Sequence, residues 1–116
     1  MAQTLSQKQR KFTRLLVKLI TWAFSKGYEI VIQEVYRAPK QAALNAKAGS
    51  GIANSLHTKC LAADLGLFLK GKYQASSAVY KPLGAYWKSL DPECRWGGDF
   101  KKPDGGHFSL GHKGVR

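Results

Sequence analysis

An acidic residue inside an apolar run is the first feature of this sequence that could do chemistry. Asp64 lies in the segment Leu61-Ala-Ala-Asp-Leu-Gly-Leu-Phe68, whose other side chains favour burial. An ionised carboxylate in a buried segment is costly unless a cation lies beside it. The cation could be one of the many Lys and Arg side chains or a metal ion. For Asp64 considered alone, an ion pair with Lys or Arg is the simpler interpretation.

A histidine seven residues earlier, His57, could share a metal ion with Asp64. Because seven extended residues span roughly 23 Å, both side chains reach one ion only if the chain turns between them. An odd separation would also place them on opposite faces of a single straight strand. A turn or bulge near Thr58 to Cys60 would satisfy both conditions. For His57 alone, an ordinary hydrogen-bonded histidine is the simpler interpretation.

The segment Asp104-Gly-Gly-His107 supplies a third possible ligand and a second carboxylate. Two neutral imidazoles and one carboxylate, from His57, His107 and Asp64, form a set that zinc accepts, with its fourth position left to water. Water bound to zinc ionises near neutral pH, and Asp104 could take its proton as a general base. Asp104 also suits a Pro-Asp-Gly-Gly turn, and the two roles are compatible.

Two further residues are weaker candidates for the same chemistry. Asp99 follows a Trp-Gly-Gly sequence and is a rival carboxylate. We rank Asp99 below Asp104 because Asp104 is nearer to His107 in the chain. His112 lies in a polar tail, where we expect its side chain to be exposed to solvent.

The two cysteines, Cys60 and Cys94, are too far apart for a close metal-ligand spacing. A disulfide between them is possible, but two cysteines are too few to indicate a secreted disulfide scaffold. Two reduced, partly buried thiols are the favoured interpretation.

The elements that must position these residues begin with an amphipathic helix. The sequence Ser6-Gln-Lys-Gln9 resembles a capping box, and apolar residues then recur at helical spacing as far as Ala23. Gly27 is placed to end this helix in a left-handed cap.

The rest of the chain mixes strands, helices and loops without regular alternation. This order predicts an α+β fold, with a small antiparallel sheet flanked by helices, in a single domain over residues 1–116. The expected elements are a strand over 28–36, a short helix from Pro39 to about residue 46, a mobile loop over 48–54, a strand over 61–69, a turn over 70–72, a helix over 79–90, an irregular loop over 91–106 and a strand over 107–110.

The chain is strongly basic, with 19 Lys and Arg against 7 Asp and Glu and a formal charge of +12. Such an excess attracts polyanions, and the attraction weakens as salt rises. Nucleic acid, anionic membrane surfaces and anionic cell-wall polymers are all compatible partners. No stretch has the roughly 20 apolar residues of a membrane-spanning helix, so we expect no transmembrane segment. The N-terminus also lacks the order of a signal peptide.

Short motifs along the chain, taken together and in their order, resemble those of the D-alanyl-D-alanine carboxypeptidase-like zinc peptidases, and within that family those of the phage-endolysin L-alanyl-D-glutamate endopeptidases. The resemblance covers nearly the whole chain. It rests on the first helix, Gly27-Tyr28, Val35-Tyr-Arg37, Ser55-x-His57, Ala62-x-Asp64, Trp96-Gly-Gly-Asp99 and Asp104-x-x-His107-Phe108.

The resemblance implies the fold of hedgehog signalling domains, with zinc on one face of the sheet. It implies one zinc per chain on His57, Asp64 and His107, with Asp104 as the catalytic carboxylate. Arg37 would polarise the scissile carbonyl or stabilise the oxyanion, and Ser55 would help to hold the substrate or the adjoining histidine.

Two residues depart from the family pattern. Cys60 stands where many members have Gly, and Ser109 stands where Glu or Gln often follows His-Phe. Neither departure is at one of the proposed metal-ligand positions.

The resulting expectation is a monomeric, zinc-dependent peptidoglycan peptidase that cuts the L-Ala–D-Glu bond of the stem peptide. Its positive charge would suit anionic wall polymers. Without a signal peptide, a lysin would accumulate in the host cytoplasm before its release to the cell wall.

Alternative functions remain open at this point. A D-Ala-D-Ala carboxypeptidase of the same fold would use the same zinc chemistry, and an inactive member could bind wall peptide. A small basic nucleic-acid-binding protein would explain the charge. That class gives no reason for the acid within residues 61–68, and the sequence has no zinc-finger or recognition-helix pattern. A metal-dependent nuclease could use the same histidines, but the sequence has no His-Asn-His arrangement on a strand–helix element. Nucleic acid is therefore the less favoured partner.

Overall fold

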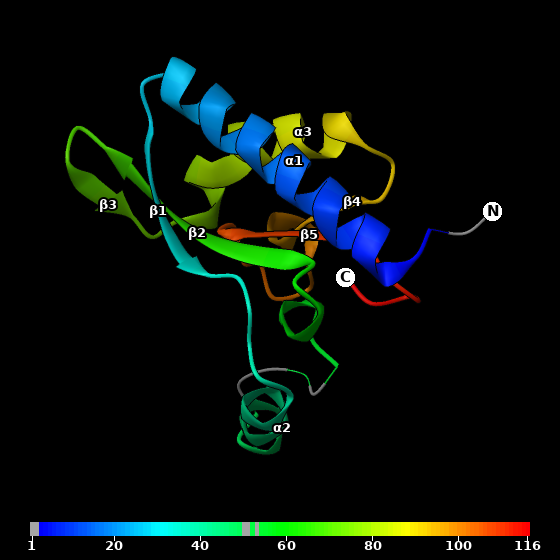
Figure 1. The fold of residues 1–116 in the computed structure, drawn as a ribbon. Helices are drawn as coiled ribbons and strands as arrows, with labels where there is room; N and C mark the ends of the chain where they lie inside the picture. Colours follow the sequence, from blue (N-terminus) through cyan, green and yellow to red (C-terminus); the bar gives the residue numbers. More distant parts are fainter. Residues whose placement is uncertain (1–2, 50–51, 53) are drawn as a thin grey trace.

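The computed structural model describes residues 3–49, 52 and 54–116, and across them five strands form one antiparallel sheet (Figure 1). The strand order is β1-β2-β5-β4, and β3 pairs with the C-terminal end of β2. Strand β2 is therefore central and pairs with three others. The strands are β1 (Glu29–Glu34), β2 (Ala62–Leu69), β3 (Lys72–Gln74), β4 (Cys94–Trp96) and β5 (His107–Leu110).

Two helices, α1 (Leu5–Ser25) and α3 (Lys81–Leu90), pack together over one face of this sheet (Figure 1). The core between them is aromatic: the Trp87 ring of α3 lies edge-on to Phe12 of α1 at 5.8 Å and to Phe108 of β5 at 6.1 Å between centroids. Leu65 and Leu67 of β2 belong to this core. Because side chains alternate along a strand, Asp64 points to the opposite face.

Helix α1 begins with a capping box two residues earlier than the sequence predicts. The Thr4 hydroxyl accepts from the Gln7 N–H at 3.1 Å, and the Gln7 side chain accepts from the Thr4 N–H at 2.8 Å. The expected box at Ser6 and Gln9 is therefore wrong, because the Thr4 box already satisfies the first free N–H groups and Ser6 lies inside the helix. The end is as expected, with Gly27 at a φ of 89°.

Several predicted elements are found, with bounds within one or two residues of those expected. Helix α2 (Pro39–Lys47) starts at the predicted proline, and the helix expected over 79–90 is α3, preceded by the 3-10 helix η2 (Ser77–Tyr80). The predicted turn is a hairpin in which Lys70 and Gly71 both have positive φ, 50° and 76°. Of the predicted loop over 48–54, residues 50, 51 and 53 lie outside the described residues.

Two strands were not predicted from the sequence. Strand β3 follows the hairpin turn, and β4 lies inside the segment that was expected to be an irregular loop. Each has three residues, which is too short for a visible alternation of apolar and polar side chains. Within the described ranges, no helix combines the length and apolar character needed to cross a membrane.

Candidate metal centre

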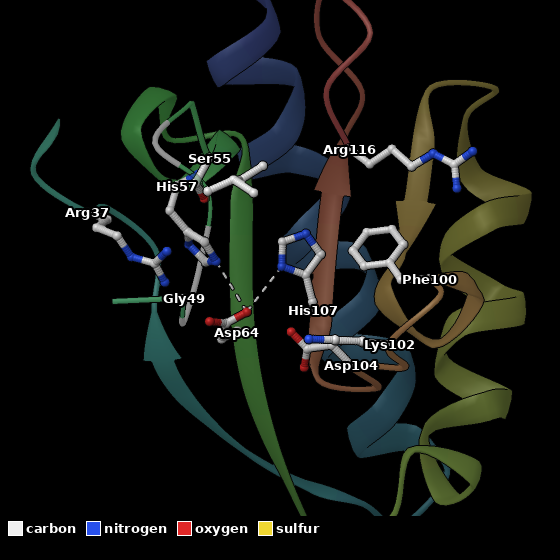
Figure 2. A pocket seen from close by; sticks show the side chains of 11 residues that line it. Arg37, Gly49, Ser55, His57, Asp64, Phe100, Lys102, Asp104, His107 and Arg116 are labelled. Carbon is white, nitrogen blue, oxygen red and sulfur yellow. Dashed lines mark hydrogen bonds and ion pairs between the residues drawn. The ribbon is translucent and has the colours of Figure 1, made fainter. Parts of the chain in front are cut away.

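The pairing of β2 with β5 brings Asp64 and His107 together. In their antiparallel register Asp64 lies directly opposite His107, and the neighbouring Leu65 N–H donates to the Gly106 carbonyl at 2.8 Å. Figure 2 shows the two side chains projecting from adjacent strands into the same space. Opposed residues on one face of such a pair are neighbours, so Asp64 Oδ1 lies 3.3 Å from His107 Nδ1.

A tight turn brings His57 to the same carboxylate. His57 lies in the 3-10 helix η1 (Leu56–Lys59), where the Ser55 hydroxyl accepts from the His57 N–H at 3.3 Å. Cys60 then adopts a left-handed φ of 54°, and the chain reverses into β2. This turn is the one expected between Thr58 and Cys60, and it forms with cysteine at a conformation that usually favours glycine. His57 Nε2 lies 3.2 Å from Asp64 Oδ1.

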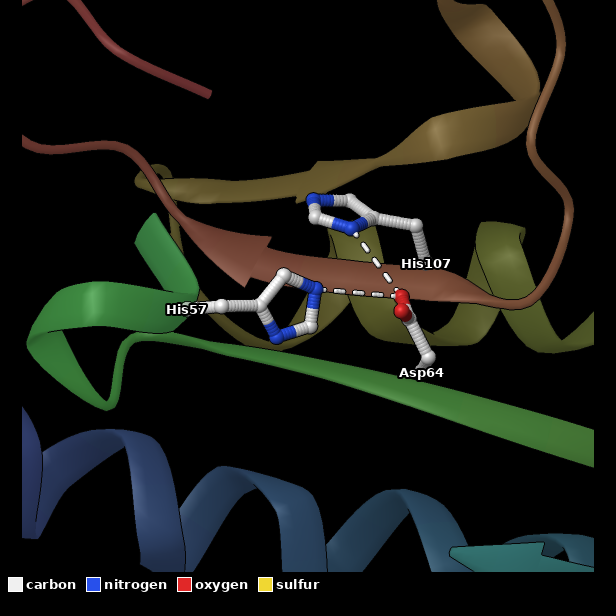
Figure 3. Close-up of side chains that lie close together, drawn as sticks. All are labelled: His57, Asp64 and His107. Carbon is white, nitrogen blue, oxygen red and sulfur yellow. Dashed lines mark hydrogen bonds and ion pairs between the residues drawn. The ribbon is translucent and has the colours of Figure 1, made fainter. Parts of the chain in front are cut away.

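The three side chains form a compact cluster (Figure 3). One potential ligand atom from each of His57, Asp64 and His107 lies within 4.8 Å of the other two. Both histidines are buried, with 2% and 7% of their surfaces exposed, while Asp64 is half-buried. The sequence-predicted ligand set is therefore brought together in space.

The hydrogen bonds of the histidines show that the cluster fits a cation. His57 Nδ1 lies 2.9 Å from the Val35 carbonyl, which can only accept, so Nδ1 carries a hydrogen. In the neutral ring, His57 Nε2 then presents a lone pair to the Asp64 carboxylate. Two acceptors at 3.2 Å require a proton or a metal ion between them.

His107 Nδ1 lies 3.3 Å from the same Asp64 carboxylate oxygen, Oδ1. Its other ring nitrogen, Nε2, is buried and has no hydrogen-bond partner among the described residues. Without a metal, the Asp64 carboxylate would hold a hydrogen on His107 Nδ1, and a metal bound to Nδ1 would replace that hydrogen. Two imidazoles and one carboxylate are a donor set that suits zinc.

The charges in the cluster favour an added cation. Burial opposes ionisation of Asp64, but hydrogen bonds and positive charge from His107 and His57 outweigh it and hold the Asp64 pKa well below its usual range. Burial likewise opposes protonation of His57, but the hydrogen bond and charge of Asp64 raise the His57 pKa overall. The carboxylate is thus ionised, and its negative charge favours a positive charge, a proton or a metal ion, at the histidine beside it.

Asp104 lies at the edge of the cluster on the loop before β5. Its N–H donates to the Gly97 carbonyl at 2.8 Å, and its own carbonyl accepts from the His107 N–H at 3.1 Å. A Cβ on Gly97 would lie 2.1 Å from the Asp104 carbonyl oxygen, so this close approach requires glycine.

The Asp104 carboxylate has no hydrogen bond or ion pair with any residue in the described part of the chain. Asp104 is an exposed residue, but partial desolvation of its carboxylate and the negative charge of Asp64 raise the Asp104 pKa, although the two histidines oppose this shift. A raised pKa suits a group that accepts a proton. The rival Asp99 instead pairs with Lys88 at 2.8 Å on the exposed surface and does not line the cavity.

Arg37 lies on the His57 side of the cluster. The Arg37 backbone N–H donates to the His57 carbonyl at 3.0 Å, and the Arg37 guanidinium forms an ion pair with Glu34. Glu34 Oε1 also lies 3.8 Å from His57 Nδ1. Sequence reasoning missed Glu34. Its position three residues before Arg37, at the end of an apolar strand, was the available signal.

A cavity of about 590 Å³ opens over these groups (Figure 2). Sequence reasoning also missed its far wall, where the Phe100 ring lies 5.4 Å from the His107 ring. No short motif marks Phe100, which lies in the loop seven residues before His107. The cavity is lined by Arg37, Gly49, Ile52, Ser55, His57, Asp64, Phe100, Lys102, Asp104, His107 and Arg116.

Three residues outside the cavity were also considered from the sequence. His112 is partly buried rather than exposed as expected, because the Lys8 Nζ lies 3.4 Å from its Nδ1 and ties α1 to the C-terminal segment. Cys60 and Cys94 are free thiols, partly buried and buried respectively. Burial raises the pKa of the Cys94 thiol to about 12, so this thiol is unreactive at neutral pH.

Comparison with solved structures finds this fold in the L-Ala D-Glu endopeptidase ChiX of Serratia marcescens. The two share 23% sequence identity, and the match covers 91% of this chain and 85% of ChiX with a TM-score of 0.69. The α+β fold, with its antiparallel sheet and flanking helices, is thereby confirmed, and the resemblance inferred from the sequence is confirmed at the level of the fold. No protein-family model and no curated protein matches the chain.

Proposed function

We propose that this chain, which folds like a bacterial L-Ala D-Glu endopeptidase, is a zinc-dependent peptidase that cuts the L-Ala–D-Glu bond of the peptidoglycan stem peptide. The observation that carries the proposal is the convergence of His57, Asp64 and His107 beside the unpaired carboxylate of Asp104. A structural ion pair would account for Asp64 alone. It would not account for two buried imidazoles and a free acid in one open cavity.

Zinc held by these three residues would supply a Lewis acid that polarises a carbonyl and lowers the pKa of water. The residues of the chain have separate roles around it. The Val35 carbonyl holds the His57 ring so that Nε2 faces Asp64. Ser55 fixes the backbone of His57 through its capping hydroxyl.

Asp104 is the proposed general base. Its carboxylate would accept a proton from the attacking water and pass it to the leaving amine as the peptide bond breaks. Arg37 is proposed to donate to the carbonyl oxygen as negative charge develops there, since a guanidinium stays charged at all relevant pH values.

Peptidoglycan as the substrate is supported by the resemblance of the motifs, by the activity of ChiX and by the charge of +12. The muropeptide carries carboxylates, and wall polymers are anionic, so a basic enzyme is attracted to both.

The test is mass spectrometry of fragments released from purified peptidoglycan, with and without a chelator. The proposal predicts stem peptides that begin with D-Glu, their loss on chelation and their return with zinc. Asp104→Asn should lower the rate about 100-fold or more, because the base is removed. Asp99→Asn is the matched control and should retain the rate. Release of terminal D-Ala alone would indicate a carboxypeptidase, and release of no fragment would contradict the proposal.

A further inference from the structure

The cleft over the metal centre has two parts that differ in charge. The cavity described above meets a second hollow of about 230 Å³, and Asp64 and Asp104 line both. A peptide that crosses the two shared carboxylates would therefore place one side of its scissile bond in each part.

The larger cavity is cationic. Arg37 lies beside His57, while Lys102 and Arg116 line the side beyond His107 (Figure 2). Arg37 is paired with Glu34. Lys102 and Arg116 make no ion pair or hydrogen bond with other residues in the described ranges, so their charges are available to a ligand. A carboxylate is the complementary group.

The smaller hollow contains no Lys, Arg or His among its described lining residues. Its lining includes the side chains of Gln33, Tyr73 and Tyr80 and the glycines Gly105 and Gly106. The Tyr80 hydroxyl is already used, since it accepts from the Leu67 N–H at 3.0 Å and donates to the Gln74 carbonyl at 2.8 Å.

The glycines of this hollow are packed closely. A Cβ on Gly106 would lie 2.6 Å from the Leu65 carbonyl oxygen, and a Cβ on Gly105 would lie 2.6 Å from the Ser77 Cα. This part of the cleft is therefore small and neutral except for the two shared acids. A short uncharged side chain fits it, and an acidic one would be repelled by Asp64 and Asp104.

We infer that the cleft sets the direction of the substrate, with Lys102 as a specificity-determining residue for a carboxylate on the leaving-amine side. This inference rests on the proposed function. In an L-Ala–D-Glu bond, D-Glu supplies the leaving amine and carries a free α-carboxylate beside it. That carboxylate lies in the cationic cavity, and the methyl group of L-Ala lies in the small hollow.

The test compares two synthetic stem peptides that differ only in whether the D-Glu α-carboxylate is free or amidated. Wild type should show a higher kcat/KM on the free acid. Lys102→Gln should reduce this preference about 5-fold, as expected for one partly exposed charge pair. Lys101→Gln is the matched control, since Lys101 lines a different hollow, and should keep the preference. The preference should also shrink as salt rises.

A third peptide tests the direction itself. With L-Asp in place of L-Ala, a second carboxylate is added on the acyl side, and wild-type kcat/KM should fall. Equal cleavage of the L-Ala and L-Asp peptides would overturn the inference, as would an unchanged acid-to-amide ratio in Lys102→Gln. Both results leave the proposed function intact. If wild type cleaves none of the peptides, the proposed function fails, and the inference fails with it.

Discussion

Glu34 connects two groups of the site, although it lines neither part of the cleft. Its carboxylate pairs with the Arg37 guanidinium and lies 3.8 Å from His57 Nδ1. The β1–β2 register places Glu34 opposite Asp64, after a bulge between Ile32 and Glu34. Such irregularities often re-aim a side chain beside an active site. We interpret Glu34 as a positioning residue that acts through Arg37.

Glu34→Gln should lower kcat roughly 10- to 100-fold with little change in KM, because a misplaced Arg37 would stabilise the developing charge less well. Steady-state kinetics on a stem peptide measures this split. Zinc content should stay near that of wild type, since the three ligands remain. Glu29→Gln, on the same strand, is the control. Equal losses of zinc and activity would instead make Glu34 a support of the metal ligands.

Sequence reasoning reached the individual ligands because each has an unusual local setting. Asp64 is an acid in an apolar run, and His107 follows two glycines. Glu34 and Phe100 have no such setting, and only the folded chain shows their contacts with Arg37 and His107. Ser55 and Arg37 were reached through the resemblance alone.

Among the elements, strand register decides whether the site exists. The sequence predicts strands over residues 61–69 and 107–110, but not that Asp64 is paired with His107. Register depends on contacts between segments far apart in the chain, whereas periodicity reports only local preference. The turn at Cys60 could be predicted because the distance between His57 and Asp64 requires one.

A group of charged residues joins α1 to the segment after α3. Lys11 Nζ lies 2.7 Å from the Asp91 carboxylate and 3.3 Å from Glu93, while Lys8 pairs with Glu93 at 3.0 Å. The Asp91 side chain is only 16% exposed. Burial opposes ionisation of Asp91, but the Lys11 hydrogen bond outweighs it and lowers the Asp91 pKa.

Asp91→Asn should lower the free energy of unfolding by about 1 kcal/mol at neutral pH, as expected for a partly buried ion pair. Because the folded-state pKa of Asp91 is depressed, this stability is present above the unfolded pKa of about 4 and is lost as pH falls through the folded pKa. Urea unfolding at several pH values should show the variant converging with wild type in acid. Asp99→Asn, which removes a more exposed pair, should have a smaller effect. A difference that persists in acid would contradict this account.

For the whole molecule, the sequence predicts the charge but not its placement. The net charge of +12 is compatible with several polyanionic partners. In the folded chain, Lys102 and Arg116 line the cavity over the candidate metal site, and the smaller hollow lacks such cations among its described lining residues. This difference between the two parts of the cleft gives the charge a role in the site itself. The fold class followed from the order of elements and agrees with the fold shared with ChiX.

The most direct test of the account is an anomalous-scattering map, collected at the zinc absorption edge, from crystals of the chain grown with zinc. We expect one strong peak per chain, bound by Nε2 of His57, an Asp64 carboxylate oxygen and Nδ1 of His107, with Asp104 nearby but not bound. Crystals of His107→Ala should lose the peak. Zinc bound elsewhere, or absent from these three side chains in a correctly folded protein, would contradict the account.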